Sequence, residues 1–186
     1  MQDPGRNKFE IDDYKISQVS DYKKLKEFDC GNKDLNDYFK NDIIKYHSEL
    51  LSQTYTIKRA TKTTPILVAL IDLCNDSVRH EKFKIDNPID KKVRDEKING
   101  YPAVKITRFG VQKEFQGLNV GTNIINIVKS MFLTENRTGC RLVTVDAYNQ
   151  KNVLKFYYKN GFSRFDDKYP NRETKPMFFD LKRFTL

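Results

Sequence analysis

Residues 107–121, which read TRFGVQKEFQGLNVG, constrain the fold of this chain more than any other segment. Residues 103–111 form an apolar-rich run that predicts a strand. Gly117 and Gly121 mark a tight turn after it. Residues 119–133 predict a helix, because apolar residues recur there at helical spacing: Val120, Ile124, Ile125, Val128, Met131 and Phe132. The segment therefore predicts a strand, a turn and a helix in succession.

A tight turn at the start of a helix is a candidate anion site. Backbone N–H groups of the turn and the positive end of the helix dipole point at one spot, where phosphate is the usual occupant. Glycine lets a pyrophosphate approach the backbone closely. The residue order matches neither the phosphate loop G-x-x-x-x-G-K-[ST] nor the dinucleotide fingerprint G-x-G-x-x-G. A plain connection between strand and helix is the alternative interpretation.

The length of 186 residues fits a single domain over 1–186 with a sizeable core. Hydrophobic residues make up 38% and charged residues 32%, which is typical of a globular protein. No apolar run is long enough to cross a membrane and no signal peptide is visible, so we expect a cytoplasmic protein. The cysteines Cys30, Cys74 and Cys140 lack C-x-x-C spacing and indicate neither a disulfide framework nor a metal site.

The net charge of the chain is +9, from 34 Lys and Arg against 25 Asp and Glu. A positive surface attracts polyanions, so nucleic acid is one candidate partner and a phosphate-bearing cofactor is another. A basic surface that is merely solvated also explains the charge, and charge alone favours this interpretation.

The remaining sequence predicts a mixed α/β protein. Strands are expected at residues 14–19, 53–59, 66–73, 101–111, 141–147, 162–165 and 175–181. Helices are expected at 21–28, 33–51, 119–133 and 152–160, the last ended by Gly161. The strands at 53–59 and 66–73 should pair as an antiparallel hairpin. Residues 1–10 predict a disordered tail, and the charge-dense residues 78–100 predict an insertion over one edge of the sheet.

Two residues with potentially reactive side chains lie in or near the predicted helix at 33–51: Cys30 just before it and His47 on it. Asn32 is a candidate N-cap, and the expected buried stripe is Leu35, Tyr38, Phe39, Ile43, Tyr46 and Leu50. We interpret Cys30 as a small core residue and His47 as a hydrogen-bond partner or surface residue. A Cys–His nucleophilic site would need a third orienting group, and no spacing selects one.

Two motifs resemble the GNAT acyltransferase superfamily. Gln116-x-x-Asn119-x-Gly121 resembles its acetyl-CoA loop, [QR]-x-x-G-x-[GA], with Asn119 where glycine is usual. Phe156-Tyr157-x-x-x-Gly161-Phe162 resembles the end of a later family helix. The resemblance covers residues 101–165 clearly and the first half loosely. It implies the α/β GNAT fold: a mixed, mostly antiparallel central sheet, splayed in the middle and flanked by helices, with acetyl-CoA in the split and no metal.

The resemblance also implies roles for individual residues. The backbone of Phe109 and Val111 would pair with pantetheine and the thioester carbonyl. The pyrophosphate would be held by Gln116, Gly117, Leu118, Asn119, Val120, Gly121 and Thr122. Asn149 would contact pantetheine, unless the register is shifted by one residue to Gln150.

Tyr157 is the expected general acid. Attack of an amine on the thioester releases CoA thiolate, and a phenol with a pKa near 10 can protonate it. Tyr158 would point elsewhere on the helix. Glu114 and Asp146 are candidate general bases only by their chemistry, and surface or ion-pair roles are favoured for both.

The acceptor stays open at this point: a small molecule, a peptide or charged tRNA. Three segments resemble GNAT toxins that acetylate the amino acid on charged tRNA. They are Phe28-Asp29-Cys30-Gly31, the pair Thr54-Tyr55 and the strand Arg108-Phe109-Gly110-Val111. The insertion at 78–100 and Gln112, where an acidic residue is frequent, depart from that pattern. We therefore expect an acetyl-CoA-dependent N-acetyltransferase acting on a primary amine in a ternary complex. Toxin-like acetylation of aminoacyl-tRNA and a non-catalytic CoA- or RNA-binding module are the alternatives, and a homodimer is compatible with each.

Overall fold

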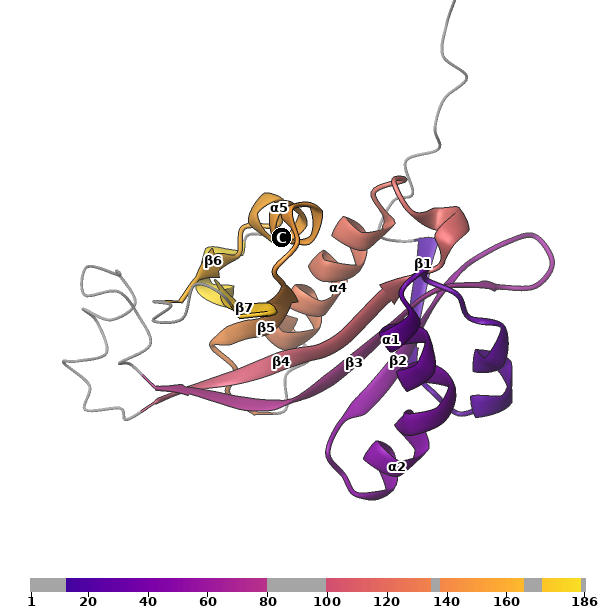
Figure 1. The fold of residues 1–186 in the computed structure, drawn as a ribbon, viewed down its shortest axis with the longest axis horizontal. Helices are drawn as coiled ribbons and strands as arrows, with labels where there is room; N and C mark the ends of the chain where they lie inside the picture. The colour runs from indigo at the N-terminus through magenta and orange to yellow at the C-terminus, as the bar shows by residue number, and fades with distance from the viewer. Residues whose placement is uncertain (1–12, 80–99, 135–137, 166–171, 185–186) are drawn as a thin grey trace, which may run out of the picture. The chain divides into compact units, whose positions relative to one another are not determined.

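The computed structural model describes residues 13–79, 100–134, 138–165 and 172–184. Its strands are hydrogen-bonded in the order β1-β2-β3-β4-β5-β7-β6, with helices flanking the sheet (Figure 1). By their contacts the residues fall into two compact units, one built from residues up to 73 with 107–128, the other from 74–106 with 129–186. The long strands β3 (Ile66–Arg79) and β4 (Gly100–Val111) and the helix α4 (Val120–Thr134) contribute to both.

The first unit contains β1 (Tyr14–Gln18) and β2 (Gln53–Arg59), which pair in antiparallel register. β2 also pairs antiparallel with β3: Gln53 lies opposite Leu73 at one end, and Arg59 lies opposite Ile66 at the other. This pairing confirms the predicted hairpin. The chain segment between β1 and β2 is helical and packs a buried core cluster of mainly apolar residues: Val19, Leu25, Phe28, Cys30, Tyr38, Phe39, Ile43 and Leu70.

The helical segment after Asn32 is interrupted by a π-helical turn. It runs as α1 (Lys33–Asp37), the π-turn η3 (Tyr38–Asp42) and α2 (Ile43–Ser48). Asn32 is the N-cap as predicted, since its side chain accepts a hydrogen bond from the Leu35 N–H at 3.1 Å. The prediction of a buried stripe was wrong at its end, because Tyr46 is 37% exposed and Leu50 is 91% exposed. The π-turn interrupts the regular helical repeat before Tyr46, although Ile43 directly after the turn is buried as predicted. Leu50 lies beyond α2, which ends at Ser48 rather than near the predicted residue 51.

The second unit holds the rest of the sheet. β4 pairs in parallel with β5 (Leu142–Tyr148). The paired stretch begins with Ala103 opposite Leu142 and ends with Ile106 opposite Val145. β7 (Thr174–Asp180) pairs antiparallel with β5 and with the short strand β6 (Ser163–Arg164). The helix α5 (Lys151–Lys159) follows β5 and ends at Gly161, whose φ of +79° suits the glycine predicted there.

The predicted element order is confirmed, with differences in extent. β3 continues past residue 73 to Arg79 and includes the buried Val78, which the sequence placed in the insertion. Most of that insertion and the predicted N-terminal tail lie outside the described residues. None of the helices within the described ranges has the length and apolar composition needed to span a bilayer.

Candidate active site

The loop before α4 has the backbone geometry of an anion cradle. Gly117 has a φ of +77° and Asn119 a φ of +63°, so both residues adopt the left-handed conformation. Asn119 thus takes the backbone shape of the glycine it replaces, because asparagine tolerates this region better than most residues. The Asn123 N–H donates to the Asn119 carbonyl at 3.1 Å, which leaves the N–H groups of Val120, Gly121 and Thr122 without an acceptor inside the helix.

The side chain of Gln116 braces this loop from within. Its amide donates to the Cys30 carbonyl at 2.8 Å and to the Val111 carbonyl at 2.9 Å. Its backbone N–H donates to the Lys113 carbonyl at 3.2 Å. Gln116 therefore orders the turn, and any contribution of this loop to an anion site comes from the N–H groups that follow it.

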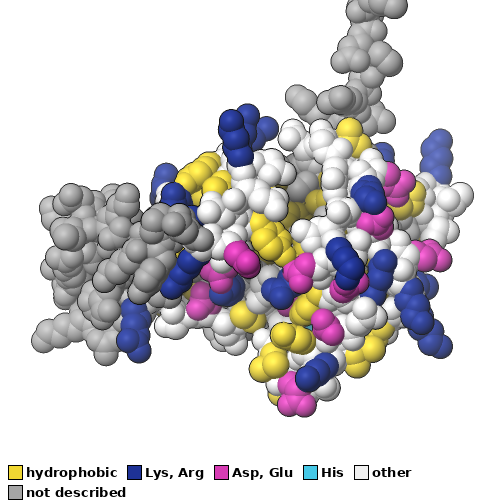
Figure 2. Space-filling model, viewed as in Figure 1, with side chains coloured by type: hydrophobic (Ala, Val, Ile, Leu, Met, Phe, Trp, Pro, Cys, Tyr) yellow, Lys and Arg dark blue, Asp and Glu magenta, His cyan; other side chains and the backbone are white. Residues whose placement is uncertain are grey.

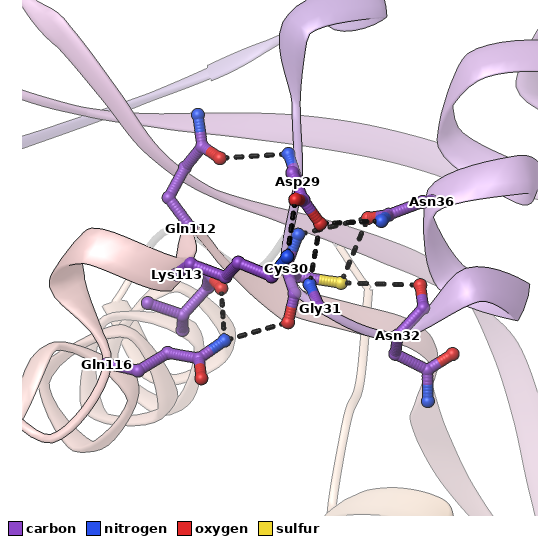
Figure 3. A network of polar contacts seen from close by, with 9 residues as sticks. Asp29, Cys30, Gly31, Asn32, Asn36, Gln112, Lys113 and Gln116 are labelled. Carbon is purple, nitrogen blue, oxygen red and sulfur yellow. Dashed lines mark hydrogen bonds and ion pairs between the residues drawn. The ribbon is translucent and has the colours of Figure 1, made fainter.

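The segment around Asp29 is part of the same network of polar contacts (Figure 3). The Asp29 carboxylate accepts hydrogen bonds from the Gly31 N–H at 2.8 Å and the Asn36 amide at 2.8 Å, and it pairs with the Lys113 ammonium at 2.7 Å. The Lys113 hydrogen bond, then those from Gly31 and Asn36, hold the pKa of Asp29 well below its usual range. The Gln112 side chain accepts from the Asp29 N–H at 2.9 Å.

Two sequence motifs noted separately therefore meet in this unit. A Cβ atom at Gly110 would come within 3.1 Å of the Phe28 ring and 3.2 Å of the Cys30 sulfur, so the close packing here favours glycine. Cys30 is buried, which raises the pKa of its thiol, and its sulfur lies 3.2 Å from the Asn36 amide oxygen. These features confirm Cys30 as a core residue.

The predicted general acid lies in the other unit, on α5. Tyr157 is buried and packs edge-on against Phe156 and Phe162, whereas Tyr158 is 47% exposed, as the helical spacing predicted. Burial raises the pKa of Tyr157 above its ordinary value, so the phenol keeps its proton at neutral pH. Asn149 precedes the helix and donates its amide to the Arg172 carbonyl at 3.1 Å.

The two candidate general bases, Asp146 and Glu114, lie in the ion-pair and surface positions that the sequence analysis favoured for them. Asp146 forms an ion pair with Lys105 at 2.5 Å, and Glu114 lies exposed in the loop before α4. Phe109 and Val111 lie on β4 beyond Ile106, the last residue in register with β5. Their pairing with pantetheine stays a prediction, as do the roles of Tyr157 and Asn149.

Comparison with known families identifies the domain. Residues 92–174 match the family model described as an acetyltransferase (GNAT) domain. Over these residues the chain is similar to GNAT acetyltransferases. No protein of curated function is similar enough in sequence to match this chain.

Solved structures with the same fold cover nearly the whole chain. A tyrosine-to-phenylalanine mutant of KacT is 20% identical with a TM-score of 0.73, over 91% of this chain and 96% of that one. AtaT complexed with acetyl-methionyl-tRNAfMet is 20% identical with a TM-score of 0.66, over 91% and 96% of the two chains. AtaTR bound with acetyl-CoA is 22% identical with a TM-score of 0.62, over 92% and 95%. At these identities the likeness shows the fold.

A buried polar network in the first unit went unrecognised in the sequence. Asp72, on β3, is fully buried and accepts hydrogen bonds from the hydroxyls of Tyr38 at 2.9 Å, Thr54 at 2.6 Å and Thr107. These hydroxyls come from η3, β2 and β4. The available signal was a single carboxylate within the apolar run of residues 66–73, since a buried charge needs partners from several elements.

His47 extends this network, which confirms its interpretation as a hydrogen-bond partner. The Thr54 N–H donates to Nε2 of His47 at 2.9 Å, so that nitrogen carries a lone pair and the proton is on Nδ1. Nδ1 lies 2.9 Å from the Tyr22 hydroxyl and donates to it. His47 thereby ties η2 (Tyr22–Glu27) and α2 to β2.

Lys129 is a second residue that the sequence analysis missed. It is 3% exposed, its ammonium lies 3.7 Å from the Phe179 ring centre, and it donates to the Asn160 carbonyl at 2.8 Å. Burial lowers the pKa of Lys129 to about 8. Its signal in the sequence was a lysine on the apolar stripe of the predicted helix, directly after Val128.

Proposed function

We propose that this chain transfers the acetyl group of acetyl-CoA to a primary amine, and that the amine is the amino acid of a charged tRNA. The observation that carries the donor part is the backbone of the loop before α4. Left-handed Gly117 and Asn119 open the turn, and the N–H groups of residues 120–122 point out of the first turn of a 15-residue helix. Such a turn suits a pyrophosphate.

Bound acetyl-CoA would supply a thioester whose thiolate is a good leaving group. The loop N–H groups hold the pyrophosphate, and the backbone of Phe109 and Val111 orients the acyl end. Asn149 contacts the pantetheine arm. Tyr157 keeps its proton until the sulfur departs and then donates it, which leaves the phenolate to recover a proton from solvent.

Two observations support charged tRNA as the acceptor: a protein of the same fold in complex with tRNA, and the net charge of this chain. AtaT, which shares the fold, is described in complex with acetyl-methionyl-tRNAfMet. The net charge of +9 is compatible with an RNA partner, since a positive surface attracts polyanions. Figure 2 shows Lys and Arg side chains interspersed with Asp and Glu on the face drawn, so individual cations rather than one continuous basic patch would have to contact RNA there.

Transfer of labelled acetyl from acetyl-CoA tests this proposal. One reaction receives charged total tRNA, and a second receives an RNase-treated extract of small molecules and peptides. We expect label in the charged tRNA that disappears when the aminoacyl ester is hydrolysed. A reaction with deacylated tRNA is the matched control and should stay unlabelled.

The other outcomes separate the competing functions. Label only in the RNase-treated extract would contradict the tRNA assignment and identify a small amine or peptide as acceptor. Binding of acetyl-CoA without label in either pool would contradict enzymatic activity and favour a binding module on a GNAT scaffold.

A further inference from the structure

Arg108, on β4, presents a guanidinium edge that is not used within the described residues. Its Nη1 donates to the Thr107 carbonyl at 2.9 Å. Its Nε is buried and has no hydrogen-bond partner among the residues described. A buried N–H without a partner costs free energy, so its persistence calls for a ligand that accepts from it.

The position of Arg108 is fixed by the buried network beneath it. The guanidinium carbon lies 4.9 Å from the centre of the Tyr38 ring, in cation–π contact. The Tyr38 hydroxyl donates to Asp72, which also accepts from Thr107, the residue before Arg108. The side chain therefore stacks on a ring that is itself held in place, and it keeps partial exposure to solvent.

Arg141 shows in the same chain what the unused edge of Arg108 is suited to. Arg141 donates from Nε and Nη2 to the two carboxylate oxygens of Asp180, at 2.6 and 2.9 Å. This side-on pairing is the geometry with which arginine binds a carboxylate or a phosphate. Arg108 offers the same edge, and no acidic side chain of the described residues forms an ion pair with it.

We infer that Arg108 binds a phosphate of the acceptor RNA through its Nε–Nη2 edge. The inference rests on the proposed function, and it names the group on the acceptor that the enzyme holds. In an aminoacyl-tRNA the carboxyl of the amino acid is esterified, so the nearest anions to the reacting amine are backbone phosphates. Arg108 directly precedes Phe109, which the proposed mechanism places at the acyl group, so an acceptor anchored there approaches the thioester.

Salt-dependent binding of deacylated tRNA tests the inference without turnover. Replacement of Arg108 by Gln removes one charge and should weaken the tRNA Kd about 10-fold or more. The slope of log Kd against log salt should fall by about 0.7 to 0.9, the value for one lost phosphate contact. Arg108→Lys keeps the charge but lacks the side-on edge, so its affinity should fall while its salt slope stays near that of the parent.

Arg183→Gln is the matched control, because it removes the same charge from an exposed position. It should change the tRNA Kd less than about 2-fold. An unchanged acetyl-CoA Kd in each variant shows that the fold is intact. If Arg108→Gln behaves like Arg183→Gln, the inference is wrong.

The two proposals can fail separately. If the parent protein acetylates no charged tRNA, the proposed acceptor is wrong, yet the tRNA titrations still test Arg108. If Arg108→Gln raises KM for a small amine that bears a carboxylate and leaves tRNA binding unchanged, the edge serves a carboxylate and the RNA assignment is overturned.

Discussion

At the scale of single residues, Asn119 shows how a departure from a motif can preserve its geometry. The GNAT pattern has glycine at this position because the loop needs a left-handed residue. Asn119 supplies that conformation with a φ of +63°. Its side chain lies exposed, so the substitution leaves the loop backbone in the shape that the motif requires.

Substitutions at Asn119 should separate backbone shape from side-chain chemistry. Asn119→Gly should keep both stability and acetyl-CoA affinity, since glycine adopts the same φ freely. Asn119→Ala should lower the free energy of unfolding by about 1 kcal/mol, because alanine resists the left-handed region, and should weaken acetyl-CoA binding as well. Urea denaturation and calorimetric titration measure the two effects. Equal behaviour of the Ala and Gly variants would contradict this account of the loop.

Tyr157 is the residue on which the proposed proton transfer depends. Tyr157→Phe keeps the ring that packs against Phe156 and Phe162 but removes the proton, so kcat should fall about 100-fold with an unchanged acetyl-CoA Kd. Because burial raises the pKa of Tyr157, ionisation of this phenol should not lower the parent's rate up to pH 9. Tyr158→Phe is the matched control and should retain full kcat. Equal rates in the two variants would exclude Tyr157 as the proton donor.

At the scale of elements, the Asp72 network ties the helical segment to three strands of the first unit. Hydroxyls from η3, β2 and β4 converge on one buried carboxylate of β3. Hydrogen bonds to a charged acceptor are stronger than neutral ones, and each hydroxyl would otherwise be buried without its partner. The network therefore sets how the Arg108 end of β4 is held against the Tyr38 ring.

Removal of the Asp72 carboxylate should be costly. Asp72→Ala should lower the free energy of unfolding by about 3 kcal/mol, because Tyr38, Thr54 and Thr107 lose their shared acceptor. Asp72→Asn keeps one acceptor oxygen and the side-chain shape, so it should lose less. Urea denaturation of both variants gives the comparison. A loss below about 1 kcal/mol for the Ala variant would show that the network contributes little.

Lys129 should make the stability of the second unit depend on alkaline pH. The folded pKa is about 8 against an ordinary 10.5, so between these values the unfolded chain binds a proton that the folded chain has released. Stability from this residue is therefore least below pH 8 and rises toward pH 10. Relative to Lys129→Met, which does not titrate, the parent should gain about 1 to 2 kcal/mol in unfolding free energy from pH 8 to 9.5. A difference independent of pH would contradict a lowered pKa.

At the scale of the whole molecule, ligand binding should appear as a shift in global stability. Acetyl-CoA binds only the folded chain, so at 100 times its Kd it should add about 2.7 kcal/mol to the free energy of unfolding and raise Tm by several degrees. Acetylated pantetheine, which lacks the pyrophosphate, should stabilise much less, because the loop N–H groups then have no anion to bind. Equal shifts with both ligands would contradict a pyrophosphate site at the loop.

The sequence by itself determined the local elements and the two family motifs. Hydrophobic periodicity predicts the hairpin strands at 53–59 and 66–73. Residues with special backbone preferences predict the Asn32 cap and the turn before α4. Both signals act over a few positions of the chain. The same local rules marked Gly161 and separated Tyr157 from Tyr158.

Only the tertiary structure decided which distant residues meet. It placed Phe28 and Cys30 against Gly110 and brought the Gln116 amide to the Cys30 carbonyl. It also brought three hydroxyl groups to the Asp72 carboxylate. It also inserted the π-turn that precedes the exposed Tyr46, and it ended α2 at Ser48, before the exposed Leu50. These outcomes depend on packing between segments far apart in the chain, and a local pattern carries no information about the partner that a buried polar group will find.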